Sequence, residues 1–262
     1  MKSFEERMAS LDTSLFDAID SQTTLDDKCS FLAVQKAVRA AGEGYCYLEI
    51  GSYMGGSLQP FILDPSCKKI YSIDKRPRSP EDDRGIPFVY HDNATERMMG
   101  LLKEVSPEGV QKVECFEGDA SEIQLSAIQE KPNLCLIDGE HTERAVLSDF
   151  RFCESVLAPN GAIMFHDANV VFTALQKIVA SLREAGRSFR AYVIPTTVFV
   201  VELDDCSFHQ SSDLQRLLID NHIPFLEVLR SMEHFREVYN MLPVRVLRAM
   251  SRRLKRVMRR NP

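Results

Sequence analysis

The sequence predicts an α/β fold built on a doubly wound, mostly parallel sheet with helices on both faces. Short runs of apolar and β-favouring residues recur along the middle of the chain, and segments with helical spacing separate them. Several of these runs stop at a Gly, Asp or His residue. The carboxyl ends of parallel strands share one edge of a sheet, where open α/β sheets bind their ligands. The predicted strands are residues 45–50, 69–73, 113–117, 134–137, 162–165, 190–194 and 197–203.

Length and composition indicate one large core with additions at both ends. The chain has 262 residues, 44% of them hydrophobic, and it contains no Trp. We divide it into an N-terminal helical cap (1–43), an α/β domain (44–205) and C-terminal helices that end in a basic tail (206–262). Within the cap we expect one helix over 3–19 and a second that starts after Ser21 or Thr24 and runs to Gly42.

The lack of an apolar targeting segment and the pattern of cysteines favour a cytoplasmic protein. No segment approaches the roughly 20 apolar residues of a membrane span, and the first ten residues are charged instead of signal-like. The seven Cys residues are scattered and form no C-x-x-C pair, so we expect reduced core residues instead of disulfides or zinc ligands.

Charge is distributed unevenly. Residues 236–262 contain nine Lys or Arg and one acidic residue, so this tail has a net charge of +8. Because the whole chain has a net charge of −6, the first 235 residues have a net charge of −14. An acidic body argues against nucleic acid as a partner. The basic amphipathic helix predicted over 244–260 suits peripheral contact with an anionic membrane, here the inner face. The alternative is a docking helix, for example between subunits of a homo-oligomer.

A glycine-rich turn follows the first strand, within the sequence YCYLEIGSYMGGS at 45–57. The strand ends at Gly51, and a helix is expected over about 55–63. Glycines here would let the backbone approach a ligand, and the helix N-terminus would offer free N–H groups. Dinucleotide sites have the spacing G-x-G-x-x-G, and Tyr53 stands where the second glycine would be, which argues against NAD. A glycine-rich corner that binds nothing is the other alternative.

An acid followed by G-x-x-x-G resembles motif I of the class I S-adenosylmethionine-dependent methyltransferases. The resemblance implies a Rossmann-like, seven-stranded sheet of order 3-2-1-4-5-7-6, whose last two strands form an antiparallel hairpin. Asp74, at the end of the second strand, is placed to accept hydrogen bonds from a ribose diol, which NAD and S-adenosylmethionine share. The segment 118–120 is similar to the family's G-D-A segment, whose acid contacts the adenine amine. The cofactor-binding residues expected are Glu49, Gly51, Ser52, Gly55, Ser57, Asp74, Asp119, Ala120 and Asp138.

Two further strand ends carry candidate catalytic groups. Asp138-Gly139-Glu140-His141 follows the fourth strand, and His166-Asp167 follows the fifth. These strands should be neighbours, so we expect Asp138, His141, His166 and Asp167 to share one small volume.

The pattern I-D-G-x-H with an H-D doublet downstream resembles the magnesium-dependent O-methyltransferases that act on sugars of macrolides and similar natural products. The resemblance implies that Asp138 and Asp167 bind a divalent metal and that His141 is the general base. His166 stands where that family often has Glu, and it is the third expected metal ligand. A His suits Zn, Mn or Fe better than Mg²⁺, which prefers oxygen ligands. The alternatives are an exposed His141 beside a helix N-cap, and a His166 that only orients Asp167.

The function predicted is methyl transfer from S-adenosylmethionine to a hydroxyl of a sugar-containing or other small-molecule acceptor. A divalent cation, Mg²⁺ or another, would assist, and residues 75–97 would form a lid or substrate loop. Two alternatives remain open. One is a nicotinamide-dependent oxidoreductase, and the other is a non-catalytic scaffold that binds nucleosides or a membrane surface.

Overall fold

The computed structural model describes residues 2–76, 92–195 and 197–219, and seven isolated positions in the tail (237, 238, 241, 243, 244, 246 and 247). The chain divides into two compact units, Met1–Ile219 and Asp220–Pro262, which are treated separately. The predicted loop over 75–97 lies largely outside the described residues, and so does most of the predicted helix over 244–260.

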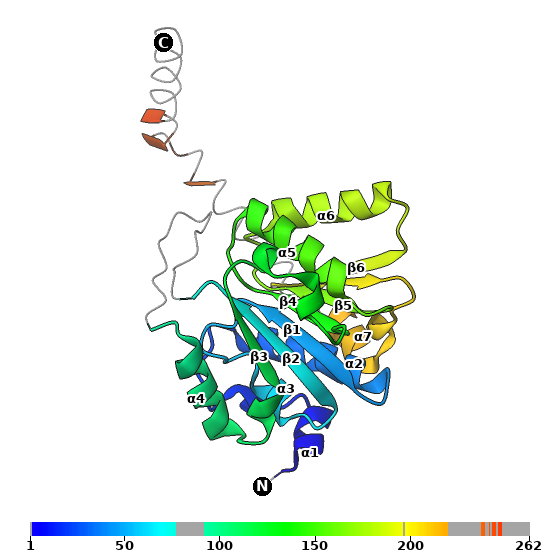
Figure 1. Ribbon diagram of the computed structural model, residues 1–262. Helices are drawn as coiled ribbons and strands as arrows, with labels where there is room; N and C mark the ends of the chain where they lie inside the picture. Colours follow the sequence, from blue (N-terminus) through cyan, green and yellow to red (C-terminus); the bar gives the residue numbers. More distant parts are fainter. Residues whose placement is uncertain are drawn as a thin grey trace. The chain divides into compact units, whose positions relative to one another are not determined.

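The first unit is built on a seven-stranded sheet of order β3-β2-β1-β4-β5-β7-β6, which confirms the predicted fold class (Figure 1). The first five strands are parallel, whereas β7 runs antiparallel to both β5 and β6. The carboxyl ends of β1, β2, β4 and β5 therefore share one edge. The strands are β1 (Tyr45–Ile50), β2 (Cys67–Asp74), β3 (Val113–Glu117), β4 (Leu134–Ile137), β5 (Ala162–Phe165), β6 (Phe189–Ile194) and β7 (Val198–Leu203).

Helices cover both faces of the sheet, and each face has its own apolar cluster. Side chains alternate along β1, so Tyr45 and Tyr47 enter one cluster and Cys46 and Leu48 the other. The first cluster lies under α1 (Phe4–Ala9), α2 (Leu25–Ala40), α3 (Gln59–Leu63), α4 (Thr95–Val105) and α7 (Ser212–Ile219). The second lies under α5 (Glu143–Val156) and α6 (Phe172–Glu184), which Figure 1 shows on one side of the sheet. This double cover makes the strand ends the exposed edge.

The N-terminal helices differ from the prediction at one point. The single helix expected over 3–19 is interrupted after Ala9, because Leu11 takes a positive φ of 50° and Asp12 caps a separate 3-10 helix over Thr13–Phe16. The second helix begins after Thr24, which is one of the two predicted starts, and Thr24 forms a capping box with Asp27. It ends near the predicted Gly42.

The segment that joins the 3-10 helix to α2 is fixed against the glycine turn by one buried side chain. Gln59 accepts hydrogen bonds from the backbone N–H groups of Ala18 and Ile19 at 2.9 Å, and it donates to the carbonyls of Phe16 and Ile19. Gly56 packs so closely on this segment that an added Cβ would lie 2.7 Å from the carbonyl oxygen of Asp20. Residues 20–23 are thereby held over the strand ends.

The helix after the glycine turn begins four residues later than predicted, at Gln59 instead of residue 55. Gly55 has a φ of +81°, which a right-handed helix excludes, and Pro60 then sits in the first turn of α3. Residues 51–58 therefore form an extended turn. Among the described residues, no helix is both long and apolar enough to span a membrane.

Candidate functional site

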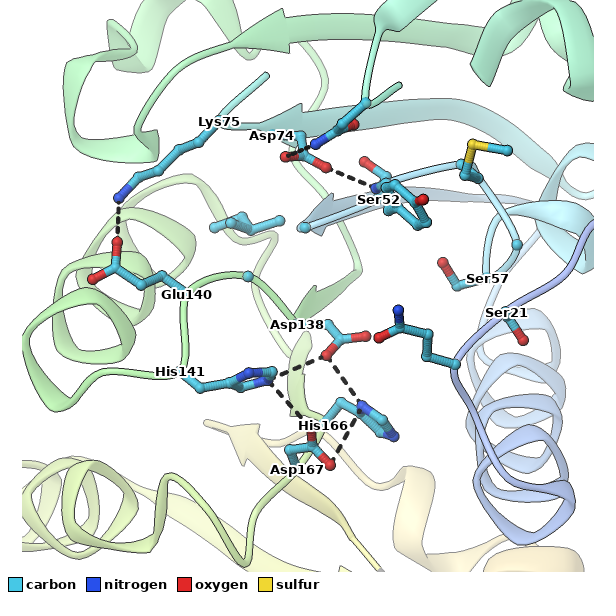
Figure 2. A pocket seen from close by; sticks show the side chains of 18 of the residues that line it. Ser21, Ser52, Ser57, Asp74, Lys75, Asp138, Glu140, His141, His166 and Asp167 are labelled. Atoms are coloured by element: carbon cyan, nitrogen blue, oxygen red, sulfur yellow. Dashed lines mark hydrogen bonds and ion pairs between the residues drawn. The ribbon is translucent and has the colours of Figure 1, made fainter. Parts of the chain in front are cut away.

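A cavity of about 450 Å³ lies at the carboxyl edge of the sheet, a size that suits a small organic ligand. Its walls come from the segment 20–23, the glycine turn, and the ends of β2, β4 and β5, and Figure 2 shows these side chains facing one another. The predicted site residues that line it are Gly51, Ser52, Ser57, Asp74, Ala120, Asp138, His141, His166 and Asp167. Three others, Glu49, Gly55 and Asp119, do not line it.

The glycine turn is shaped by its contact with the end of β4. Gly51 has a φ of +96°, and a Cβ on it would lie 2.1 Å from the carbonyl oxygen of Asp138. Glycine is therefore required here by both conformation and space. The turn then directs the backbone N–H of Tyr53 to a carboxylate oxygen of Asp74 at 2.7 Å. The glycine turn is thus in direct contact with both Asp138 at the end of β4 and Asp74 at the end of β2.

Glu49 lies beneath the turn, fully buried, and supports it from below. Its carboxylate accepts hydrogen bonds from the hydroxyls of Tyr47, at 2.7 Å, and Ser57. Burial raises the pKa of Glu49 to about 7. Ser57 lines the cavity, so Glu49 reaches the ligand space only through this hydroxyl.

Asp74 stands at the end of β2 and faces the cavity. One carboxylate oxygen accepts the Tyr53 N–H, and the other accepts the amide of Asn93 at 3.3 Å. The Asn93 amide oxygen is held in turn by the Arg76 guanidinium at 3.1 Å. Each carboxylate oxygen can accept more than one hydrogen bond, so a fixed Asp74 still has room for ligand hydroxyls.

An ionic cluster occupies the end of the cavity next to β3. Lys75 contacts both Asp119 and Glu140 at 2.8 Å. Asp119 also accepts the backbone N–H of Ser121, and although burial opposes the shift, the Lys75 and Ser121 contacts lower the pKa of Asp119 to about 2. The side chain expected to meet the adenine amine is therefore engaged within the protein.

Asp149 is a lining residue that the sequence analysis missed. It lies on α5, is 5% exposed, and no described group is recorded as hydrogen-bonded to its carboxyl. Burial, and next the negative charge of Asp119, raise the pKa of Asp149 to about 7. A usable signal was present, because Asp149 interrupts the apolar stripe of Val146, Phe150 and Cys153.

The two strand ends after β4 and β5 meet as predicted. Nε2 of His141 lies 3.7 Å from Asp138 Oδ1 and 3.4 Å from Asp167 Oδ2 (Figure 2). Asp167 takes a positive φ of 51°, a conformation that a non-glycine residue seldom adopts. The fold thus imposes an unusual backbone at the position that brings this carboxylate to His141.

His166 lies deeper than His141 and contacts carboxylates on both sides of its ring. Nδ1 is 3.1 Å from Asp138 Oδ1, and Nε2 is 3.3 Å from Oδ2 of Asp27 on α2. Burial disfavours the charged ring, but these carboxylates outweigh it and raise the pKa of His166 to about 11. Conversely, although burial opposes it, the charge of His166, the hydrogen bond between His166 and Asp138, and the nearby His141 lower the pKa of Asp138.

One group of side chains in the described part of the chain could hold a metal ion. Asp138, His141 and Asp167 each offer one ligand atom, and these atoms lie within 4.8 Å of one another. Two carboxylates and one imidazole form a donor set that fits a divalent cation such as Mn²⁺ or Zn²⁺. The expected set contained His166 in place of His141, whereas in the structure the ring nitrogens of His166 face Asp138 and Asp27.

Fold and site together define a class. A 3-2-1-4-5-7-6 sheet with a glycine turn after β1 and an acid after β2 is the arrangement of the class I S-adenosylmethionine-dependent methyltransferases. Residues 48–168 match the family described as methyltransferase domain. This segment, a little under half of the chain, is thus similar to a methyltransferase domain, and the sheet that contains it has the class I methyltransferase topology.

Solved structures share this fold at low sequence identity. The O-methyltransferase TomG from Streptomyces achromogenes, which is involved in tomaymycin synthesis, is 16% identical with a TM-score of 0.50, and the match covers 78% of this chain and 90% of TomG. CalS11, a calicheamicin methyltransferase, is 16% identical with a TM-score of 0.51, covering 77% and 93%. MycE of the mycinamycin pathway, solved with Mg, S-adenosylhomocysteine and mycinamycin VI, is 14% identical with a TM-score of 0.50, covering 78% and 56%. No curated protein matches the sequence.

Proposed function

We propose that this protein transfers the methyl group of S-adenosylmethionine to a hydroxyl of a small-molecule acceptor, such as a sugar-containing one. The observation that carries this proposal is the position of the Asp138–His141–Asp167 group in the same cavity as the glycine turn and Asp74. One wall thus has the groups for a nucleoside cofactor, and the other has a base between two carboxylates. TomG is solved with S-adenosylmethionine and MycE with S-adenosylhomocysteine, the form of the cofactor that has lost its methyl group. These ligands support the choice of cofactor.

The cofactor would lie along the strand ends. Asp74 would accept the ribose hydroxyls, and Gly118 with Ala120 would border the adenine. The amino acid end would lie near Gly51, Ser52 and Ser57, where the turn leaves polar groups at the surface of the cavity. Glu49 and Asp119 would act indirectly, through Ser57 and Lys75.

His141 would be the general base. Methyl transfer is an in-line displacement, so the acceptor oxygen must lie about 3 to 3.5 Å from the methyl carbon and lose its proton as the bond forms. An ordinary histidine has a pKa near 6.5 and can take a proton at neutral pH. Asp167, 3.4 Å from His141 Nε2, would stabilise the imidazolium that results.

A divalent cation fits beside this base. Asp138 and Asp167 would hold it, and when bound it would stabilise negative charge on the acceptor oxygen. His141 uses the same Nε2 for both acids, so its role as base and its role as metal ligand exclude each other. We assign His141 to the base and leave the metal to the two carboxylates, the acceptor and water.

A nicotinamide-dependent oxidoreductase fits the turn less well. Dinucleotide binding uses a glycine where this chain has Tyr53, and the backbone N–H of Tyr53 is already engaged by Asp74. A non-catalytic scaffold would not explain why two carboxylates and a histidine converge at the cavity wall.

The cell location and further partners are part of the proposal. The charge of −14 on the first 235 residues argues against nucleic acid, and the +8 tail supports peripheral binding of a cytoplasmic enzyme to an anionic membrane surface. A role for the tail in a homo-oligomer is the competing use of the same segment.

Transfer of a labelled methyl group tests the proposal. The protein is incubated with methyl-labelled S-adenosylmethionine and fractionated cell extract, with and without EDTA, and labelled small molecules are isolated. We expect an alkali-stable methyl ether, loss of transfer in EDTA, and recovery with Mg²⁺ or Mn²⁺. Full activity in EDTA would remove the metal from the proposal, and label on nitrogen or carbon would remove the hydroxyl acceptor.

A further inference from the structure

His166 is held between two carboxylates that come from distant parts of the chain. Asp138 follows β4, whereas Asp27 lies in the first turn of α2, more than one hundred residues earlier. The Asp27 side chain is 2% exposed and that of His166 is 7% exposed, and their contact is 3.3 Å long. A buried ion pair of this kind costs desolvation, so its partners must be well placed to be stable.

Asp27 is itself fixed by several donors. Its Oδ2 accepts the backbone N–H and the hydroxyl of Thr24, at 3.1 and 2.6 Å, in the capping box of α2. Its Oδ1 accepts the hydroxyl of Thr197 at 2.9 Å, in the turn between β6 and β7. The ring of Phe31, one helical turn further along α2, packs edge-on against His166 with centroids 5.7 Å apart. The orientation of the His166 ring is therefore determined on both sides.

This orientation decides which oxygen of Asp138 is left for a ligand. The Asp138 carboxylate interacts with His141 and His166. Among the described residues, all of these contacts are made by Oδ1. Oδ2 of Asp138 has no recorded partner there. A carboxylate anchored through one oxygen presents the other in a fixed direction.

We propose that Asp27 is a positioning residue of the active site: it holds the His166 ring so that Nδ1 donates to Asp138 Oδ1 and turns Oδ2 of Asp138 toward the bound ligand. The inference rests on the proposed function, since it concerns the same cavity. Both ring nitrogens of His166 face carboxylates of the protein, Nδ1 that of Asp138 and Nε2 that of Asp27, and His166 is not part of the group that could hold a metal. Since an ionised carboxylate only accepts hydrogen bonds, we expect a proton on each ring nitrogen. His166 is thereby assigned a structural role, and through Asp27 it links α2 to Asp138 in the proposed active site.

Nuclear magnetic resonance of histidine-labelled protein tests this assignment without any substrate. The full chain is labelled with ¹⁵N-histidine, and the ring signals of His166 are assigned from the spectrum of His166→Gln. We expect two protected N–H signals for His166, and we expect both to persist when ZnCl₂ is added. A single N–H signal, or loss of either one on addition of zinc, would overturn the proposal. This outcome does not depend on whether the protein is a methyltransferase.

Variants of Asp27 test the positioning role. Asp27→Asn and Asp27→Ala are compared with Asp26→Asn, an exposed acid in the same helical turn with the same change of charge. In Asp27→Ala we expect loss of protection at Nε2–H and a shift of the Nδ1–H signal. We expect a fall of about tenfold or more in kcat for methyl transfer in the extract assay, a near-constant KM for S-adenosylmethionine, and partial retention of activity in Asp27→Asn. Asp26→Asn should match the wild type.

Two results would contradict the positioning role. One is a folded Asp27→Ala protein with unchanged His166 signals. The other is an equal fall in kcat in all three variants, accompanied in thermal unfolding by a matching loss of stability. If no variant and no wild-type sample transfers methyl groups, the proposed function fails while the signals of His166 still decide the geometry.

Discussion

His141 lies where proton transfer and metal binding would compete for one nitrogen. If it is the base, His141→Ala should lower turnover by about 10² to 10⁴, because general base catalysis contributes on that scale. S-adenosylhomocysteine affinity, measured by calorimetry, should change little. Added imidazole should restore part of the rate. A variant that keeps full turnover, or one that loses only its response to Mn²⁺, would contradict the assignment.

Asp149 makes stability depend on pH. The folded pKa of about 7 lies above the ordinary value of 3.8, so the folded chain keeps a proton that the unfolded chain releases. The free energy of unfolding therefore falls as pH rises from about 4 to about 7. Asp149→Asn removes this loss, and the drop in melting temperature between pH 5 and pH 8 should be smaller in the variant.

The comparison should be made against Glu154→Gln, another acid on α5. Glu49 titrates in the same range and will keep some pH dependence in every variant. Equal pH dependence of the melting temperature in Asp149→Asn and wild type would show that the carboxyl of Asp149 is ionised in the folded protein.

Residues at strand ends were predictable, and residues on helices were less so. Asp138, His141 and Asp167 converge because adjacent parallel strands deliver their ends to one edge, which the sequence pattern reveals. Asp27 was recognised only as a first-turn acid of a helix, and nothing in its neighbourhood indicates that α2 packs with this turn against His166. That contact depends on tertiary packing between segments far apart in the chain.

At the scale of elements, the glycine turn and the end of β2 form the wall of the cavity where we propose that the cofactor binds. Asp74→Ala should weaken S-adenosylhomocysteine binding by about 10-fold or more, since an unpaired ligand hydroxyl costs on the order of 1 to 3 kcal/mol. Asp119→Asn is the matched control, because Asp119 does not line the cavity, and it should change affinity by less than about threefold. Calorimetric titration measures both. Equal losses in the two variants would return Asp119 to the adenine contact expected from sequence.

Element boundaries were the weaker part of the prediction. Strand 45–50 has the bounds that were expected, because its apolar run ends at a glycine. The first helix and the start of α3 were wrong, because residues with positive φ, Leu11 and Gly55, interrupt segments whose spacing looks helical. A positive φ at Leu11 has no signal in the residue type, since such a conformation is stabilised only by its surroundings.

At the scale of the whole molecule, the sequence separates an acidic body from a basic tail, and the chain also divides into units at Ile219. Removal of residues 220–262 should abolish sedimentation with phosphatidylglycerol vesicles, since each Lys or Arg near an anionic surface contributes about 1 kcal/mol. Vesicles of phosphatidylcholine serve as the neutral control. S-adenosylhomocysteine affinity should not change, because the residues that line the cavity precede 168. Undiminished vesicle binding by the shortened chain would exclude the tail as the anchor.

The doubly wound α/β class of the first unit was predictable from its alternating strands and helices, whereas the strand order was implied by the family resemblance. The antiparallel position of β7 between β5 and β6 was inferred from resemblance, and the structure confirms it. Chemistry is not fixed by topology, since related folds carry different reactions. The cofactor must therefore be tested directly.

Calorimetric titration of the full chain with S-adenosylmethionine, S-adenosylhomocysteine and NAD tests the central claim most directly. We predict that both sulfur ligands bind at one site per chain, that Asp74→Ala weakens both, and that NAD gives no heat of binding. Saturable binding of NAD with no binding of either sulfur ligand would contradict the proposed methyltransferase function.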